Sequence, residues 1–283
     1  MMRVIVSGGF DDLRSHQVRF LHEASRLGRV VVLLWSDEMI ESVTGKAPKL
    51  PQEERHYLTQ AMRYVEEVIV ARHTFDPREL PFAEMEIIRP DVWVVTQDSQ
   101  SEKKLSFCAA HEIQYRVLEA RDLEGFPQAV TEPARKVTGP AEAQDANPVR
   151  VMVTGCFDWF HSGHVRFFEE AAEYGDLYVV VGHDENVRLL KGEGHPLFPQ
   201  DERRYMIQAV RHVKEAVIST GHGWMDAEPE VQRLKPGRYI VNEDGDRPEK
   251  RRFCERYGIK YIVLQRTPRE GLIRRTSTEL RGY

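Results

Sequence analysis

The C-terminal half of the chain alternates short apolar runs with longer stretches of helical periodicity. The apolar runs are rich in β-branched residues and predict five strands, near Val151–Thr154, Leu177–Gly182, Val217–Ser219, Tyr239–Val241 and Tyr261–Leu264. The longer stretches predict helices near His164–Tyr174, Asp201–Val213 and Pro248–Tyr257. Strands that are apolar almost throughout and that alternate with helices are typical of a parallel sheet covered on both faces. The pattern therefore predicts an α/β fold.

The pattern occurs twice along the chain. The stretch "VIVSGGFD" that begins at Val4 aligns with "VMVTGCFD" that begins at Val151. A nearly constant shift also aligns residues 51–70 with 199–218, and residues 94–118 with 240–264. A repeat of this length indicates a pair of domains and not a solenoid.

The boundaries of the two domains follow from composition. Residues 126–148 are rich in Pro, Ala and small polar residues, which is typical of a linker. We therefore expect a first copy over residues 1–125, a linker over 126–148 and a second copy over 149–283.

The stretch "GCFDWFHSGHVRFF" at residues 155–168 carries the candidate chemistry. It follows a predicted strand and opens a predicted helix, with His161 and His164 three positions apart and Gly163 between them. Residues at i and i+3 share a helix face, and glycine lets a ligand approach the backbone closely. The start of a helix also attracts anions. This arrangement predicts a phosphate-binding cradle; the alternative is that the two histidines only cap the helix or face solvent.

Composition narrows the classes of ligand. The chain has 283 residues, of which 41% are hydrophobic and 30% charged, as in ordinary globular proteins. A formal net charge of −5 argues against nucleic acid as a partner, although a small phosphorylated molecule can bind a local basic pocket. Three scattered cysteines predict neither a disulfide framework nor a metal site, and no apolar stretch is long enough to span a membrane. We expect a cytoplasmic protein.

The second copy resembles the nucleotidyltransferase (cytidylyltransferase-like) family. The resemblance rests on "GCFDWFHSGHVRFFEEAAEYGD", "LLKGEGHPLFPQDER", "VRHVKEAV" and "TSTEL", and it extends through nearly all of residues 150–283. The tandem layout is similar to ethanolamine-phosphate cytidylyltransferases, and the second copy alone is similar to glycerol-3-phosphate cytidylyltransferases. The resemblance implies two Rossmann-like (HUP-type) domains.

The resemblance also implies a reaction. A nucleotidyl group would pass from a nucleoside triphosphate, with CTP favoured, to a phosphorylated alcohol or sugar, with release of pyrophosphate. Magnesium would arrive with the nucleotide, and no metal ligands are assigned to the protein. Two alternatives stay open: an ATP-dependent adenylyltransferase of the heptose-phosphate type, and a non-catalytic nucleotide-binding sensor or scaffold.

Site residues are carried over from the family position by position. The catalytic groups would be His161, His164 and Lys191, which would stabilise charge on the phosphates. The nucleotide-binding residues would be Gly155, Cys156, Phe157, Asp158, Gly163, Trp224, Asp244, Thr276, Ser277 and Thr278. The phosphate or acceptor would be bound by Arg203, Arg211 and Arg266.

Several of these assignments have a structural alternative. Arg203 and Arg211 recur in the first copy as Arg55 and Arg63, which is equally compatible with a shared structural role. Trp224 could be a core residue, and Asp244 could serve a turn. The long spacer "PREGLIRR" leaves open whether Arg266, Arg274 or Arg275 fills the late arginine position.

The first copy lacks the imidazole pair. Arg14-Ser15-His16-Gln17 stands where the second copy has His161-Ser162-Gly163-His164. We therefore expect residues 1–125 to be catalytically silent and to act as a built-in partner of the second copy, forming a pseudo-dimer within one chain. A further homodimer of the whole chain is compatible with this arrangement.

Overall fold

The protein is described by a computed structural model that covers residues 1–71, 82–127 and 148–280. The chain divides into two compact units, Met1–Phe126 (unit 1) and Pro127–Tyr283 (unit 2). Most of the linker expected over residues 126–148 lies outside the described residues.

Unit 2 contains a five-stranded parallel sheet with the strand order β10-β9-β6-β7-β8. Its strands are β6 (Arg150–Gly155), β7 (Asp176–Val181), β8 (Val213–Ile218), β9 (Arg238–Asn242) and β10 (Lys260–Leu264). The central strand β6 pairs through Val151 with Leu177 of β7 and with Arg238 of β9. Because all the strands are parallel, their carboxyl ends lie at one edge of the sheet.

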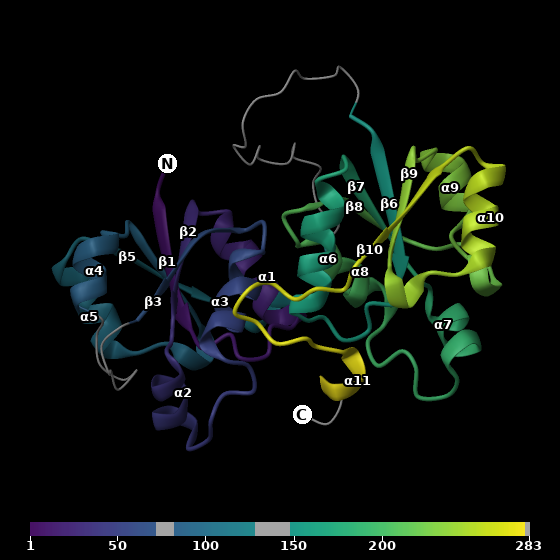
Figure 1. Cartoon of the computed structure of the whole chain (residues 1–283). Helices are drawn as coiled ribbons and strands as arrows, with labels where there is room; N and C mark the ends of the chain where they lie inside the picture. Colours follow the sequence, from purple (N-terminus) through teal and green to yellow (C-terminus); the bar gives the residue numbers. More distant parts are fainter. Residues whose placement is uncertain (72–81, 128–147, 281–283) are drawn as a thin grey trace. The chain divides into compact units, whose positions relative to one another are not determined.

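Helices cover both faces of this sheet (Figure 1). They are α6 (Ser162–Ala172), α7 (Asp184–Lys191), α8 (Gln200–Gln208), α9 (Glu228–Leu234), α10 (Pro248–Arg256) and α11 (Ser277–Leu280). Short 3-10 turns occur at η3 (Gly223–Met225) and η4 (Glu243–Gly245). Met152 of β6 packs in the cluster formed with α9 and α10, through residues such as Val231 and Phe253. On the other face, α6 buries Val165 and Phe168.

Unit 1 has the same strand order about its own first strand, β3-β2-β1-β4-β5. Its strands are β1 (Arg3–Gly8), β2 (Arg29–Leu34), β3 (Val65–Val70), β4 (Val92–Thr96) and β5 (Gln114–Leu118). Its helices are α1 (Ser15–Ser25), α2 (Asp37–Thr44), α3 (Gln52–Gln60), α4 (Phe82–Ile88) and α5 (Glu102–Ala110), with 3-10 turns η1 (Gln97–Ser99) and η2 (Ala120–Leu123). The α/β class and the two parallel sheets flanked by helices are confirmed.

The prediction for one helix of unit 2 was wrong at its end. The sequence predicts a helix from Asp201 to Val213, whereas α8 ends at Gln208 and β8 begins at Val213. The Gln208 side chain accepts a hydrogen bond from the backbone N–H of Ala216 (2.8 Å), which ties the end of the helix to the strand that follows. The short helices α7 and α9 were not predicted, because neither is long enough to establish a clear apolar period.

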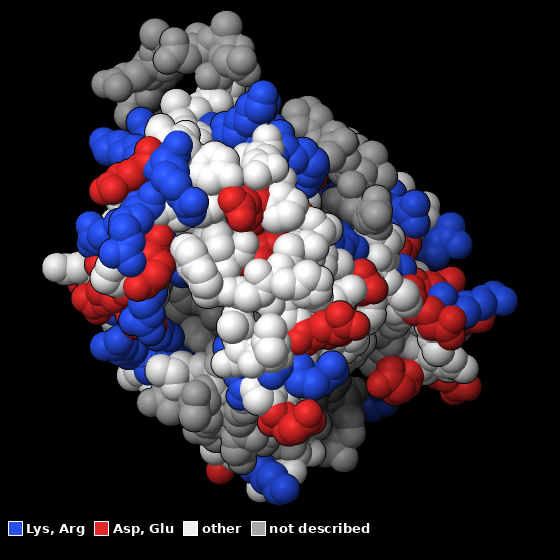
Figure 2. Space-filling model, turned by 90° about the vertical axis from the view of Figure 1, so that its right-hand side faces the viewer, with Lys and Arg blue, Asp and Glu red and all other residues white. Residues whose placement is uncertain are grey.

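The face of unit 2 that carries α9 and α10 mixes both signs of charge. Figure 2 shows Lys and Arg side chains gathered along one margin, with Asp and Glu among them and an uncharged area between. On α10, exposed Glu249 and Glu255 alternate with exposed Arg251 and Arg252. Among the described helices, none has the length and apolar character needed to cross a membrane.

Candidate functional site

The two histidines of unit 2 lie at the start of α6, at the carboxyl edge of the sheet. His161 is the N-cap of this helix, and its Nδ1 accepts a hydrogen bond from the backbone N–H of Gly163 (3.1 Å). The imidazole rings of His161 and His164 are stacked, with centroids 3.9 Å apart and planes 24° apart. Capping and convergence of the rings therefore occur together, so the two interpretations of this pair do not exclude each other.

Each imidazole has a buried nitrogen without a hydrogen-bond partner among the described residues. These atoms are Nε2 of His161 and Nδ1 of His164. The Nδ1 of His161 accepts a hydrogen bond, so in the neutral ring the proton is on Nε2, which is a donor. Leaving a buried donor unsatisfied costs about 1–3 kcal/mol. A ligand that brings an acceptor oxygen to this point would remove that cost.

The charges around the pair favour an anion. Burial, together with the nearby charges of Arg266 and Arg275, lowers the pKa of His161 to about 3. Burial also lowers the pKa of His164 well below its ordinary value, with contributions from His161, Arg266 and Lys191. Both rings are therefore neutral near pH 7 in the free protein, and they are surrounded by cationic side chains.

Lys191 and Arg266 reach this site from different parts of the chain. Lys191 is the last residue of α7, exposed, and followed by Gly192 in the left-handed region (φ 85°). Arg266 follows β10 and donates to Asp244 Oδ2 (2.5 Å) and to the backbone carbonyl of Arg275 (2.9 Å). The structure thus brings the expected His161, His164, Lys191, Arg266 and Asp244 to one edge of the sheet.

The late segment lies close to the start of α6. A Cβ atom placed on Gly163 would lie 3.6 Å from the carbonyl oxygen of Arg275. The Ser277 hydroxyl donates to the backbone carbonyl of Trp159 (3.3 Å). Thr276 immediately precedes α11, and Thr278 belongs to α11 by its backbone, while the Thr278 side chain lies outside the described residues.

Gly155 and Phe157 form a wall behind the imidazoles. Phe157 adopts a positive φ of 53° and lies with its ring centroid 5.3 Å from that of His164, edge to face. A Cβ on Gly155 would come within 2.7 Å of the Phe157 ring, so only glycine fits at the end of β6. Unit 1 has the same positive φ at Phe10.

Asp158 has a structural role. Its Oδ1 accepts hydrogen bonds from the backbone N–H groups of Leu197 (2.7 Å) and Phe198 (3.1 Å), and its side chain is buried. In unit 1, Asp11 accepts in the same way from the backbone N–H groups of Lys49 (2.8 Å) and Leu50 (3.0 Å). This carboxylate anchors the loop that leads into α8 or α3.

Arg203 also has a structural role. Its guanidinium is buried and donates to the backbone carbonyls of Phe198, Cys156 and Gly182 and to the carboxylate of Asp184, at 2.6–2.9 Å. These bonds favour the structural alternative for Arg203. They also show how Cys156 participates, because its carbonyl, and not its thiol, makes the short contact.

Two further expected residues lie apart from the histidines. Arg211 comes two residues before β8 and therefore lies at the amino edge of the parallel sheet, opposite the site. Trp224 is on η3, half exposed, with its ring edge-to-face with Phe253 at 6.4 Å. The Asn186 side chain holds the adjacent Gly223 by two hydrogen bonds, at 2.7 and 3.0 Å.

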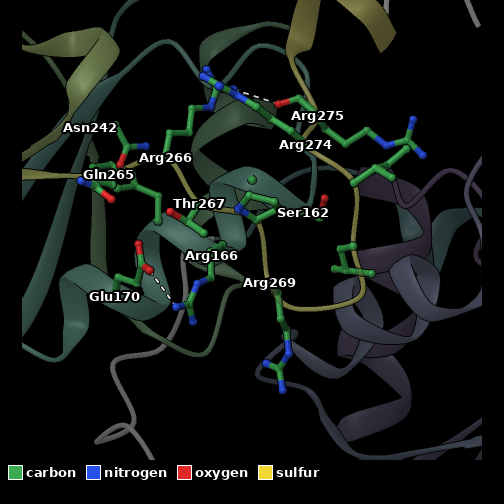
Figure 3. A pocket seen from close by; sticks show the side chains of 15 residues that line it. Ser162, Arg166, Glu170, Asn242, Gln265, Arg266, Thr267, Arg269, Arg274 and Arg275 are labelled. Carbon is green, nitrogen blue, oxygen red and sulfur yellow. Dashed lines mark hydrogen bonds and ion pairs between the residues drawn. The ribbon is translucent and has the colours of Figure 1, made fainter.

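A basic pocket adjoins the start of α6 (Figure 3). It encloses about 380 Å³, including open solvent at its mouth, between α6 and the segment 265–275. Ser162 and Gly163 form one side of it. Its arginines are Arg166, Arg266, Arg269, Arg274 and Arg275.

Sequence reasoning missed most of the residues that line this pocket. Asn242 ends β9 and Gln265 follows β10, so the rule that ligands collect at the carboxyl ends of parallel strands could have identified both. Arg166 lies three residues after Gly163, on the same face of α6. Arg269 belongs to the spacer, whose path the sequence pattern did not predict.

Comparisons with known proteins relate unit 2 to a protein family. A family model described as cytidylyltransferase-like matches residues 152–273. A FAD synthase of Aciduliprofundum boonei (strain DSM 19572 / T469) is 38% identical over 120 residues, which are 41% of this chain and 77% of that protein.

Two further relatives match shorter stretches. A FAD synthase of Thermococcus kodakarensis (strain ATCC BAA-918 / JCM 12380 / KOD1) is 40% identical over 97 residues, so this chain spans 63% of that protein and the match covers 34% of this chain. A bifunctional protein HldE of Aliarcobacter butzleri (strain RM4018) is 42% identical over 69 residues, or 24% of this chain and 14% of that protein.

Proposed function

Because this chain belongs to the cytidylyltransferase-like family, we propose that unit 2 is a nucleotidyltransferase that joins a nucleoside triphosphate to a phosphorylated acceptor and releases pyrophosphate. The observation that carries the proposal is the stacked imidazole pair at the start of α6, with a buried nitrogen on each ring that no described residue satisfies. Phosphate oxygens are the acceptors that such a donor requires. The cations Arg266 and Lys191 add the matching charge.

The reaction needs no covalent enzyme intermediate. An oxygen of the acceptor's phosphate forms a bond to the α-phosphorus, and the bond from that phosphorus to the bridging oxygen breaks as pyrophosphate leaves. His161 Nε2–H would donate to a phosphate oxygen whose negative charge increases in the transition state. Arg266 and Lys191 would stabilise the charge of the leaving group, and the cradle at α6 would hold the phosphates in line for attack.

Magnesium is proposed as the companion of the nucleotide. No cluster of three His, Cys, Asp or Glu side chains is placed for a metal ion in the part of the chain that the structure describes. Mg²⁺ is commonly held by substrate phosphates together with one or two carboxylates and water, so such a site suits this chain. When bound, the ion would neutralise triphosphate charge and make attack by an anionic phosphate easier.

The sequence and the relatives support different donor nucleotides. Resemblance to cytidylyltransferases favours CTP. Two of the relatives are named FAD synthase, and FAD carries an adenylyl group, which supports ATP. We therefore propose ATP as a donor at least on a par with CTP.

Pyrophosphate release from the full chain tests the proposal. It would be measured with ATP and with CTP, each paired with FMN, glycerol 3-phosphate or a heptose phosphate. Replacing both His161 and His164 with Ala should lower turnover by at least about 10²-fold, the scale of removing one preorganised donor. The matched control is His16→Ala, at the exposed position of unit 1 that aligns with Gly163, which should leave turnover unchanged. Undiminished turnover in the double variant would overturn the proposal.

A further inference from the structure

The loop that connects α7 to α8 begins directly after Lys191. This α7–α8 loop comprises residues 192–199 (Figure 1). Lys191 is exposed, and its side chain makes no hydrogen bond or ion pair to a described residue. Burial and nearby charges, among them Lys191, lower the pKa of His164, so this lysine lies near the imidazole pair. The backbone on either side of Lys191 therefore determines where its charge is held.

The first half of the α7–α8 loop has little contact with the rest of unit 2. Gly192 and Gly194 have positive φ angles of 85° and 81°, and a Cβ atom on either would meet no atom within 4 Å. Residues 191–194 are all exposed. Glycine has more conformational freedom than any other residue. Without a further contact, the loop would leave Lys191 poorly fixed on its C-terminal side.

His195 is the first residue of the loop that is partly buried. Its Nδ1 lies 3.6 Å from Oδ2 of Asp158, and the two side chains are 23% and 4% exposed, respectively. This distance is too long for a hydrogen bond but is within the range of an ion pair. Oδ1 of Asp158 accepts from the backbone N–H groups of Leu197 and Phe198. One buried carboxylate thus contacts the loop at three positions, of which His195 is the nearest to Lys191 along the chain.

The equivalent carboxylate of unit 1 is used differently. Asp11 accepts from the backbone N–H of Leu50 through Oδ1 and from that of Lys49 through Oδ2. In unit 2 both backbone N–H groups bind Oδ1, and Oδ2 faces His195. Ala47 stands at the position that aligns with His195. The anchor of the loop is therefore common to both units, whereas the contact with an imidazole belongs to unit 2.

Lys191 and His195 occur together in the unit that has the imidazole pair. Thr44 ends α2 in unit 1, as Lys191 ends α7 in unit 2, so the aligned positions of unit 1 carry neither a lysine nor a histidine. A contact found in both units serves the fold that they share. A contact found only beside the imidazole pair points to the function of that pair.

We propose that His195 is a positioning residue for Lys191, an inference that rests on the proposed function. His195 interacts through its Nδ1–H with the carboxylate of Asp158, which reduces the unattached part of the loop to residues 192–194. The restricted glycines hold the ammonium group of Lys191 near the imidazole pair, where the triphosphate needs it. His195 itself does not touch the nucleotide and acts through the lysine.

Limited proteolysis of the full chain tests the loop without any ligand. A protease that cleaves after lysine should cut after exposed Lys191, and exposed Lys46, in the corresponding loop of unit 1, is the internal reference. His195→Ala should raise the rate of cleavage at Lys191 relative to Lys46 by at least about twofold, because the loop opens more often. His195→Arg retains a cation for Asp158 and should restore the original ratio. An unchanged ratio in His195→Ala, or an Arg variant as sensitive as the Ala variant, would overturn the proposal.

Binding of a non-hydrolysable triphosphate tests whether the effect of His195 passes through Lys191. Titration calorimetry on the full chain would use analogues of ATP and of CTP. Lys191→Ala should weaken binding by about tenfold or more, the scale of a charge-assisted hydrogen bond. His195→Ala should weaken it by about two- to fivefold, the scale of a partly exposed ion pair. The double variant should lose no more than Lys191→Ala alone, whereas additive losses would mean that His195 acts independently and would overturn the proposal.

The outcome can be distinguished from failure of the proposed function. His16→Ala, at an exposed position of unit 1, is the matched control and should change neither cleavage nor binding. If the two losses in unit 2 are not additive but the unmodified chain releases no pyrophosphate, the role of His195 stands and the transferase proposal fails. If pyrophosphate release depends on the imidazole pair but His195→Ala changes neither cleavage nor binding, the reverse holds.

Discussion

Arg55 of unit 1 and Arg203 of unit 2 make equivalent contacts. Arg55 donates to the backbone carbonyls of Leu50, Gly9 and Trp35 and to Asp37, at 2.6–3.0 Å. Each of these partners aligns with the corresponding partner of Arg203. A side chain that makes the same four contacts in a unit with the imidazole pair and in a unit without it serves the fold.

Removing either arginine should therefore destabilise its own unit. We expect Arg203→Met and Arg55→Met each to lower the free energy of unfolding by about 3 kcal/mol, since buried carbonyls lose a charged donor and a carboxylate loses its partner. Urea denaturation measures this. If Arg203→Met instead kept its stability and only raised the KM for nucleotide, the structural interpretation would be wrong.

The buried histidines should make unit 2 sensitive to acid. The pKa of His161 is about 3 in the folded protein, against about 6.5 when the chain is unfolded. Between these values the unfolded chain binds the extra proton, so the stability present above pH 6.5 is lost as the pH falls. Each such group contributes up to about 1.4 kcal/mol per pH unit in this window.

The double variant His161→Asn, His164→Asn isolates this contribution. Asparagine can still cap α6 but does not titrate, so the loss of stability from pH 7 to 5 should become shallower. Chemical denaturation at fixed pH values checks this. Part of the slope should persist, because burial also lowers the pKa of His22 in unit 1 and of His212 in unit 2. An unchanged slope would mean that the two imidazoles already bear protons in the folded state.

At the scale of elements, the periodicity of apolar residues was enough to predict a strand and the helix after it where both are well packed. The β6–α6 segment was predicted nearly as found, because its apolar positions, such as Val151 and Phe168, are completely buried. The end of α8 was not predicted correctly, because it depends on the contact between Gln208 and β8, which forms only in the folded sheet.

The candidate site likewise has one part that the local sequence predicts and one part that only the folded chain brings together. His161, Gly163 and His164 are neighbours in sequence, so local spacing was enough to predict a cradle. The pocket combines α6 with Asn242 and with the segment 265–275, and these parts meet only after the parallel sheet has aligned their strands. The charges and spacings in the sequence do not indicate that these segments lie together in the folded chain.

We expect Gly163 to be needed for the position of the His161 imidazole and not for the stability of the fold. A Cβ there would lie 2.9 Å from Cε1 and 3.0 Å from Nδ1 of His161, so Gly163→Ala should displace the imidazole. Gly163 is within α6 and its φ is not positive, so alanine suits the backbone. We expect turnover to fall about tenfold or more while the melting temperature is unchanged or slightly raised. A fall in melting temperature that accounts for the lost activity would contradict this.

At the scale of the whole molecule, the two units share a topology but differ at the start of their first helices. In unit 1 the Arg14 guanidinium pairs with Asp12 (2.8 Å), and the Gln17 side chain accepts from the backbone N–H of Arg14 (3.0 Å). The groups that replace the imidazoles are thus engaged within unit 1. This supports the prediction that unit 1 is silent.

The built-in-partner hypothesis for unit 1 has a direct test. Residues 148–283 would be expressed alone and compared with the full chain by light scattering and by pyrophosphate release. If unit 1 replaces a second subunit, the isolated segment should dimerise or lose activity. A stable, fully active monomer would exclude the hypothesis.

The difference between the units also predicts how many nucleotides one chain binds. In unit 1 the charge of Arg14 is offset by Asp12, whereas the imidazole pair of unit 2 lies near the cations Arg266, Arg275 and Lys191. We therefore expect one nucleotide per chain. Calorimetric titration with a non-hydrolysable triphosphate gives the stoichiometry, and hydrogen exchange locates the site. Protection should occur at the start of α6 and not at the start of α1. Two equivalents bound, with protection at both helices, would mean that the arginine and glutamine of unit 1 form a second nucleotide site and that the imidazoles are needed for chemistry but not for binding.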